Sequence, residues 1–301
     1  MNKENNYHGV FALPVIPYFE DETLDEESFV NELNFCLKAD VHGIAVPLES
    51  GEFYRLSDEE RLTIAELTVE TIDGNCPVVI GISATNIPLA VKFAKHAQEI
   101  GADAILSIPP YGGIVPFEYT IKYFQSIADV SNIPIILQNT KPPIGPTLST
   151  DDLYKIVQSV KDIQYIKDET TPTGQRISSL LAKKGDLIKG IFGGLGGKFM
   201  LNELDRGSSG IMTSCQIIDI HMQIYENYIN GNIKEAREIF HKILPLINLD
   251  GNGMWLQNAK TILMKRGIIN NNIVRGQGKL DRKDQEDLEI AFENVKPLFR
   301  I

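Results

Sequence analysis

The sequence has few of the residues that build disulfide frameworks or metal sites. Its three cysteines, Cys36, Cys76 and Cys215, are odd in number and widely separated, which excludes a disulfide framework and a cysteine metal cluster. The five histidines show no metal-ligand spacing, so we predict no metal. Any chemistry must come from other side chains.

Positive charge and long apolar runs are also scarce. The chain has 29 Lys and Arg against 40 Asp and Glu, a formal net charge of -11, which argues against nucleic acid or an anionic membrane as partner. No apolar run reaches the length of a membrane span, and residues 1–6 lack the apolar region of a signal peptide. We expect a cytoplasmic protein whose partner is a small molecule.

Motifs for nucleotide binding are missing as well. The first apolar run is not followed by a Gly-x-Gly-x-x-Gly turn, and the glycine-rich residues 193–197 lack the Gly-Lys-Ser/Thr ending of a phosphate loop. Glycine lets the backbone approach a ligand closely, so we predict that Gly193 leaves room for substrate. No cofactor is expected.

Short apolar runs alternate with helical patterns over the first 214 residues. The runs lie at residues 10–17, 43–47, 77–82, 104–109, 134–139, 163–169, 187–193 and 209–213. Continuous apolar runs are typical of parallel strands covered by helices, and eight of them close most simply into a (β/α)8 TIM barrel, an α/β fold. A doubly wound open sheet is the alternative.

After residue 214 the pattern becomes purely helical. Helical periodicity at residues 217–228, 233–247 and 254–265 follows with no strand between, then a predicted loop at 268–285 and a last helix to about Val295. We therefore predict two units, a barrel domain with the active site at residues 1–214 and a C-terminal helical extension at 215–301.

A lysine ends the most informative of the predicted strands. Residues 163–169 carry the β-branched and aromatic side chains of a strand, and residues 171–174 open the next helix. Catalytic groups of such barrels stand at the carboxyl ends of the strands. Burial there favours a neutral amine, which can attack a carbonyl and form a Schiff base. Lys167 is thus a candidate nucleophile, with a solvated surface lysine as the alternative.

Other strand ends offer groups for binding and proton transfer. Ser50 and Gly51 offer a hydroxyl and backbone N–H groups that suit a carboxylate, or form an ordinary loop. Glu169 stands two residues after Lys167, on the same side of the strand, as a base beside an imine or as a plain ion-pair partner. Tyr111 is a candidate proton carrier, or a packing residue.

Five motifs spread over nearly the whole chain occur together, at residues 43–52, 109–111, 133–139, 165–167 and 206–212. In combination they resemble the dihydrodipicolinate synthase/N-acetylneuraminate lyase family of Schiff-base-forming barrels. The resemblance implies that Lys167 forms the imine, that Ser50 and Gly51 bind a carboxylate and that Tyr111 relays protons. It also implies a homo-oligomer, a dimer or tetramer.

Two departures from that family narrow the expected reaction. Gln138 stands where the family's synthases and lyases carry a tyrosine, and residues 140–145 lack the arginine that synthases place after this strand. The residues around Gln138 and Lys167, with residues 244–248, are more similar to the 2-keto-3-deoxy sugar-acid dehydratase branch. In that branch the glutamate two residues after the lysine is implied as the base.

We therefore predict a Schiff-base-forming hydro-lyase that dehydrates a 2-keto-3-deoxy sugar acid. Lys167 would form an iminium at C2, and Glu169, aided by Tyr111, would remove a C3 proton before the neighbouring hydroxyl leaves as water. Substrate binding is assigned to Ser50, Gly51, Gln138, Gly193 and Met212. The alternatives are an aldolase or dihydrodipicolinate synthase reaction through the same imine, and a barrel that binds a 2-oxo acid without catalysis.

Overall fold

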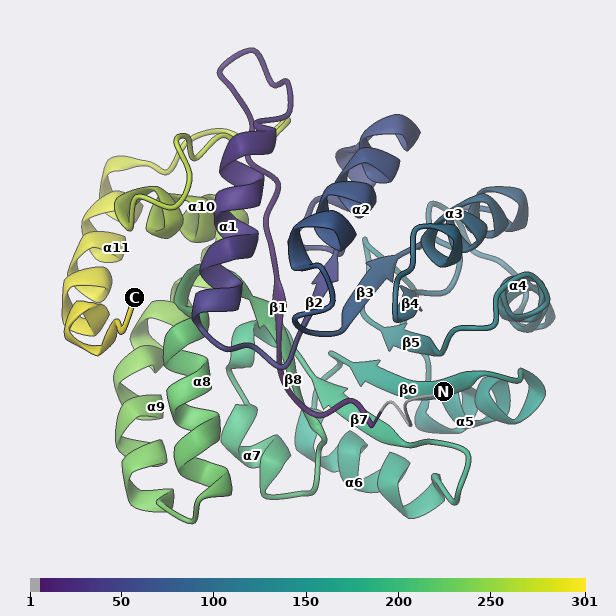
Figure 1. Cartoon of the computed structure of the whole chain (residues 1–301). Helices are drawn as coiled ribbons and strands as arrows, with labels where there is room; N and C mark the ends of the chain where they lie inside the picture. The colour runs from purple at the N-terminus through teal and green to yellow at the C-terminus, as the bar shows by residue number, and fades with distance from the viewer. Residues whose placement is uncertain (1–5) are drawn as a thin grey trace.

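A computed structural model describes residues 6–301 and confirms the predicted barrel. Parallel strands close in chain order, with β8 beside β1 (Figure 1). The strands are β1 (Gly9–Leu13), β2 (Gly43–Val46), β3 (Val78–Gly81), β4 (Ala104–Ser107), β5 (Ile135–Asn139), β6 (Ile163–Asp168), β7 (Gly190–Gly193) and β8 (Gly210–Ser214). Each falls inside or within one residue of a predicted apolar run.

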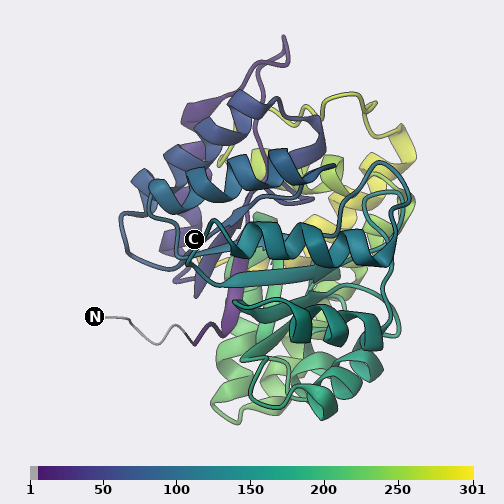
Figure 2. The ribbon, with the colours of Figure 1, turned by 90° about the vertical axis from the view of Figure 1, so that its right-hand side faces the viewer.

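Helices alternate with these strands and cover the outside of the barrel (Figures 1 and 2). They are α1 (Glu26–Lys38), α2 (Asp58–Ile72), α3 (Ile87–Glu99), α4 (Phe117–Ala128), α5 (Thr150–Ser159), α6 (Thr173–Lys183), α7 (Met200–Leu204) and α8 (Ile218–Ile229). A capping box starts α2, because the Ser57 hydroxyl accepts from the Glu60 N–H at 3.1 Å and the Glu60 carboxylate accepts from the Ser57 N–H at 2.8 Å.

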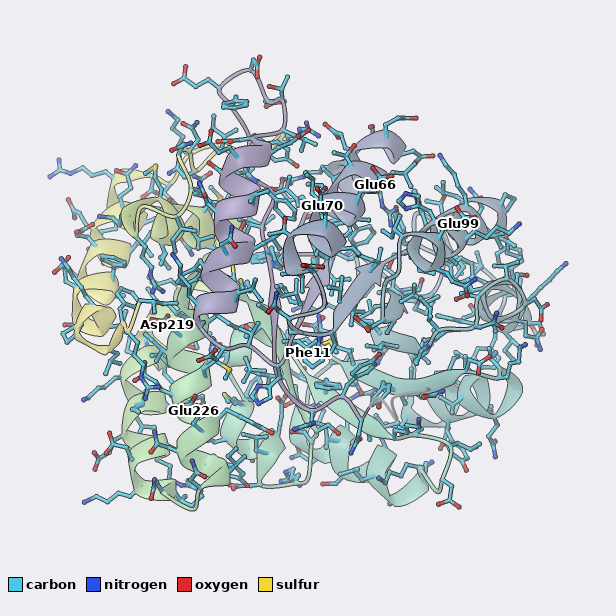
Figure 3. The ribbon with its side chains drawn as sticks, in the orientation of Figure 1. Phe11, Glu66, Glu70, Glu99, Asp219 and Glu226 are labelled. Carbon is cyan, nitrogen blue, oxygen red and sulfur yellow. The ribbon has the colours of Figure 1, made fainter. Side chains whose placement is uncertain are left out.

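Side chains that point into the barrel fill its amino-terminal half. Phe11, Tyr165 and Phe192 form an aromatic floor, with ring centroids 5.4 Å apart for Phe11 and Phe192 and 6.2 Å for Tyr165 and Phe192. Figure 3 labels Phe11 among the strands. The alternate residues of the strands, such as Ile166, pack outward against the helices. A filled floor leaves the carboxyl end of the barrel as the place for a ligand.

The chain after β8 is helical, as predicted. Helix α8 packs against β1 and so completes the ring of barrel helices. Three more helices follow on one flank of the barrel: α9 (Ile233–Asn248), α10 (Trp255–Lys265) and α11 (Arg282–Val295). The division into units at residues 214 and 215 stays a prediction.

Two predicted boundaries are wrong. The first strand ends at Leu13 and not at Pro17, because Pro14 has no N–H to continue the ladder. The last loop ends four residues early, since the Asp281 carboxylate accepts from the Asp284 N–H at 2.8 Å and starts α11 at Arg282.

The loop before α11 contacts the segment that follows β1 and the start of α2. The Arg275 guanidinium donates to the Glu22 carbonyl at 2.6 Å and pairs with Glu60 on α2, which ties this loop to the segment after β1. In Figure 1 the two segments meet at the top of the view.

Residues 1–5, in the segment considered for a signal peptide, lie outside the described residues. In the part of the chain that the structure describes, no helix is both long enough and apolar enough to cross a membrane.

Candidate active site

Lys167 is the residue before the last in β6, and its side chain lies inside the barrel. Tyr165, two residues earlier, belongs to the inward-facing cluster, and strand alternation puts Lys167 on the same side. The side chain is only 1% exposed. The alternative of a solvated surface lysine is therefore wrong, because the amine is enclosed at the carboxyl end of the barrel.

Glu169 holds the Lys167 amine. The distance from Lys167 Nζ to Glu169 Oε2 is 3.2 Å, and the Gln138 amide donates to the same carboxylate oxygen at 2.5 Å. The backbone N–H of Leu195 donates to Glu169 Oε1 at 3.1 Å. Gln138 and the Lys167 amine therefore share one Glu169 oxygen, and the carboxylate is positioned from β5, β6 and the loop after β7.

A polar network on the outer side of the barrel holds the carboxyl ends of β5 and β6 in place. Asn139 on β5 donates to Asp168 on β6 at 3.0 Å, and Asp168 accepts from Arg176 on α6 at 2.8 Å. Arg176 and Asn139 both also bond to the Leu148 backbone. Since neighbouring residues of a strand face opposite sides, this network fixes Lys167 and Glu169 without touching them.

A tight turn after β2 presents Ser50. The Glu52 N–H donates to the Glu49 carbonyl at 3.1 Å and the Phe53 N–H donates to the Leu48 carbonyl at 3.2 Å. The Ser50 hydroxyl is buried and has no hydrogen-bond partner among the described residues. A buried orphan hydroxyl facing a cavity suits a polar ligand group.

A buried ion pair holds this turn from the C-terminal side of the chain. Lys260 on α10 and Glu52 are both fully buried, with Lys260 Nζ 2.5 Å from Glu52 Oε1. Lys260 also donates to the Ile273 carbonyl at 2.6 Å and lies 4.4 Å from the centre of the Tyr18 ring. The helical extension is thus attached directly to the turn at residues 48–53, called the binding turn below.

A cavity of about 370 Å³ opens above Lys167 and Glu169. Ser50 and Met212 line it, with Thr213 and Ser214 from the end of β8. The loop after β7 contributes Leu195, Gly196, Lys198 and Phe199, and the helical extension contributes Ile247, Asp250, Gly251 and Trp255. The volume suits a small organic acid.

Two further carboxyl groups face the cavity. Burial raises the pKa of Glu49 to about 7; Glu169 adds to that rise, while Lys167 and Lys141 oppose it. Burial also raises the pKa of Asp250 to about 7, against a lowering by Lys198. Carboxyl groups with a pKa near neutral pH are suited to proton transfer.

The other residues predicted for the site lie around the cavity and not on its wall. Gly51 belongs to the binding turn, and Tyr111 packs its ring edge-on against Phe53, with centroids 5.3 Å apart. Gly193 faces away from the cavity, because a Cβ there would meet the Glu203 carboxylate on α7. A Cβ on Gly194 would instead meet the Glu169 carboxylate, so Gly194 is the glycine that makes room for this side chain.

Glu49 and the cavity residues of the helical extension are not among those that the sequence predicts for the site. The signal for Glu49 was present, since it directly precedes Ser50 at a strand end. Trp255, the single tryptophan of the chain, gives no comparable signal, because helical periodicity does not tell which end of a barrel a helix covers.

Residues 6–301 contain no group of three or more His, Cys, Asp or Glu side chains that could hold a metal ion. The described cavity wall offers an amine, carboxyls, hydroxyls and an aromatic ring. These groups suit covalent and acid–base chemistry on an organic acid.

Comparisons with known proteins agree with this geometry. Residues 6–294 match the sequence profile of the dihydrodipicolinate synthetase family. The chain is 26% identical over 268 residues to an L-2-keto-3-deoxyarabonate dehydratase of Azospirillum brasilense, covering 87% of this chain and 86% of that protein. It is 27% identical over 243 residues to a 4-hydroxy-tetrahydrodipicolinate synthase of Methanopyrus kandleri, covering 79% of each.

Solved structures share the architecture. The crystal structure of dihydrodipicolinate synthase from Rhodopseudomonas palustris matches with a TM-score of 0.88 at 23% identity, over 96% of this chain and 98% of that chain. At this identity the similarity concerns the fold.

Proposed function

Since the chain belongs to the dihydrodipicolinate synthetase family, a family of lyases, we propose that it forms a Schiff base with a 2-oxo acid and removes water from a 2-keto-3-deoxy sugar acid. The observation that carries the proposal is the buried Lys167 amine, 3.2 Å from the Glu169 carboxylate, at the base of the cavity. A dehydratase among the relatives supports the choice of reaction.

The first step is imine formation at Lys167. The amine gives up a proton to solvent and attacks the C2 carbonyl, and the C2 oxygen then leaves as water. The Ser50 hydroxyl would hold the C1 carboxylate, a role supported by its lack of a partner among the described residues and by its position on the cavity wall. The resulting iminium withdraws electrons from C2 and acidifies the hydrogens on C3.

The second step is removal of a C3 proton by Glu169. The Gln138 amide and the Leu195 N–H keep both carboxylate oxygens in place during this transfer. Gln138 has no ionisable proton of its own, so Glu169 is the base at this position. Electrons released from C3 then expel the hydroxyl on C4, and hydrolysis of the imine returns Lys167.

Borohydride trapping with pyruvate tests the imine. We expect covalent mass on the peptide that contains Lys167, and none in Lys167→Met. Lys189→Met, which changes an exposed lysine just before β7, serves as the matched control and should trap normally. An unmodified Lys167 in the folded wild type would reject the scheme.

A panel of 2-oxo-3-deoxy acids, scored by mass spectrometry, tests the reaction. Loss of water supports the proposal, whereas release of pyruvate indicates an aldolase and consumption of aspartate semialdehyde indicates the synthase reaction. Thermal stabilisation by these acids without turnover would indicate a binding protein. Glu169→Gln should keep trapping but lower turnover by roughly 10²- to 10⁴-fold, the usual contribution of a general base.

A further inference from the structure

The Glu49 carboxyl has no role in the steps above, although it faces the reacting groups. It lines the same cavity as Lys167 and Glu169 and interacts electrostatically with both. Among residues 6–301 its side chain makes no hydrogen bond and no ion pair. A glutamate beside a buried amine, yet unbound to it, is free to act on a ligand.

The two carboxyl groups at the base of the cavity have different surroundings. Glu169 is surrounded by donors, namely the Lys167 amine, the Gln138 amide and the Leu195 N–H. Glu49 has none of these, and burial together with the charge of Glu169 raises its pKa to about 7. Paired carboxyls in such unlike environments divide into a base and an acid.

Loss of a sugar hydroxyl needs an acid. Hydroxide is a poor leaving group, and the steps above assign no proton donor to it. Resting on the dehydration proposed above, we propose that Glu49 is the general acid that protonates the C4 hydroxyl as it leaves.

The step balances in atoms and charge. Glu169 takes the C3 proton, and the C3–H electron pair forms the enamine double bond. The enamine electrons then expel the C4 oxygen, which takes the Glu49 proton and leaves as water. Protons move from Glu169 to solvent and from solvent to Glu49 before the next cycle, and hydrolysis of the conjugated iminium releases the product from Lys167.

Other cavity groups fit this role less well. Burial raises the pKa of Asp250 as well, but Asp250 stands on the wall made by the helical extension, and the charged group that acts on it is Lys198. Tyr111 does not line the cavity. The hydroxyls of Thr213 and Ser214 are far weaker acids than a carboxylic acid.

The test compares water loss with fluoride loss. Fluoride departs with little help from an acid, so a 2-oxo-3-deoxy acid with fluorine at C4 bypasses the proposed donor. Glu49→Gln should lower water elimination by roughly 10²- to 10⁴-fold but fluoride elimination by less than about tenfold. Glu49→Gln should also keep pyruvate trapping and the exchange of C3 hydrogens in D₂O. Glu169→Gln should keep trapping but lose this exchange.

The controls separate this role from a structural one. Glu70→Gln changes an exposed glutamate on the outer face of α2 (Figure 3) and should behave as wild type. Equal loss of water and fluoride elimination in Glu49→Gln, or lost C3 exchange, would overturn the acid role. So would unchanged dehydration in Glu49→Gln, or the expected pattern appearing in Asp250→Asn instead. If the wild type removes water from no acid of the panel, the proposed function and this inference both fail.

Discussion

Replacing Lys260 with methionine should both destabilise the protein and weaken ligand binding. The substitution removes the buried amine that pairs with Glu52 at 2.5 Å and leaves the fully buried carboxylate without its closest cation. Breaking one side of a buried pair costs about 3–5 kcal/mol. We expect the lower end of this range, because the Arg55 guanidinium still reaches the other Glu52 oxygen at 3.1 Å.

A double-mutant cycle isolates the pair. Glu52→Gln alone should also destabilise, since Lys260 keeps only the Ile273 carbonyl at 2.6 Å and the Tyr18 ring. The double variant Lys260→Met with Glu52→Gln should be less destabilised than the sum of the single variants by about 2–3 kcal/mol. Additive losses would show that the two residues do not act as a pair, and would refute the reasoning.

The assay is urea unfolding at one fixed protein concentration. With a slope of about 3 kcal/mol/M, a loss of about 3 kcal/mol lowers the midpoint by about 1 M. Lys265→Met is the matched control on the same helix, because its partner Glu289 is at the surface and such pairs contribute about 0–1 kcal/mol.

The functional part of the prediction follows from the turn that Glu52 belongs to. Without Lys260 the turn that presents Ser50 is less restrained, and a displacement of about 1 Å at a reacting group costs on the order of 10²-fold. Borohydride trapping should therefore need more pyruvate in Lys260→Met under conditions in which the variant is fully folded. Trapping at the wild-type pyruvate concentration would show that the pair stabilises the fold alone.

Three further outcomes are expected. Burial raises the pKa of Glu32 to about 8 from an unfolded value of 4.5, so between these pH values the folded state binds a proton that the unfolded state has lost, and stability falls as the pH rises. Glu32→Gln should therefore show a smaller drop in urea midpoint than the wild type between pH 5 and pH 8.5, and equal drops would contradict this. Gly194→Ala should abolish turnover while the protein stays folded by circular dichroism, because the new methyl would overlap Glu169; normal kcat would show that the carboxylate has room elsewhere. Trp255 is the only tryptophan and lines the cavity, so a 2-oxo acid should change the emission of the wild type and Trp255→Phe should lose that signal; unchanged emission at saturating ligand would place binding away from this wall.

Much of the barrel could be predicted because buried parallel strands leave a strong local signal. Apolar runs bounded by helical patterns located each strand, and the two-residue repeat placed Lys167 and Glu169 on one side of β6. The same repeat could also have placed Gly193 on the outer side, since Phe192 points inward. The local pattern is sufficient to predict which way a side chain faces when that direction depends on a single strand.

The rest of the site depends on contacts between distant parts of the chain. Lys260 and Glu52 are 208 residues apart in the sequence, and no periodicity in either segment predicts that they pair. The partner of Gln138 likewise lies on a different strand, so its role as a support for Glu169 follows only from the closed sheet. Tyr111 shows the same limit, because its packing against Phe53 joins two loops that the sequence keeps apart.

The cavity wall supplied by the helical extension has a consequence for how this protein can change. Lys167 lies on β6 and Glu169 directly follows this strand, whereas Ile247, Asp250 and Trp255 come from the last quarter of the chain. Substitutions of these three residues can change the shape of this wall while Lys167 and Glu169 keep their positions. This wall of the cavity can therefore vary in shape independently of the amine and carboxylate at the end of β6.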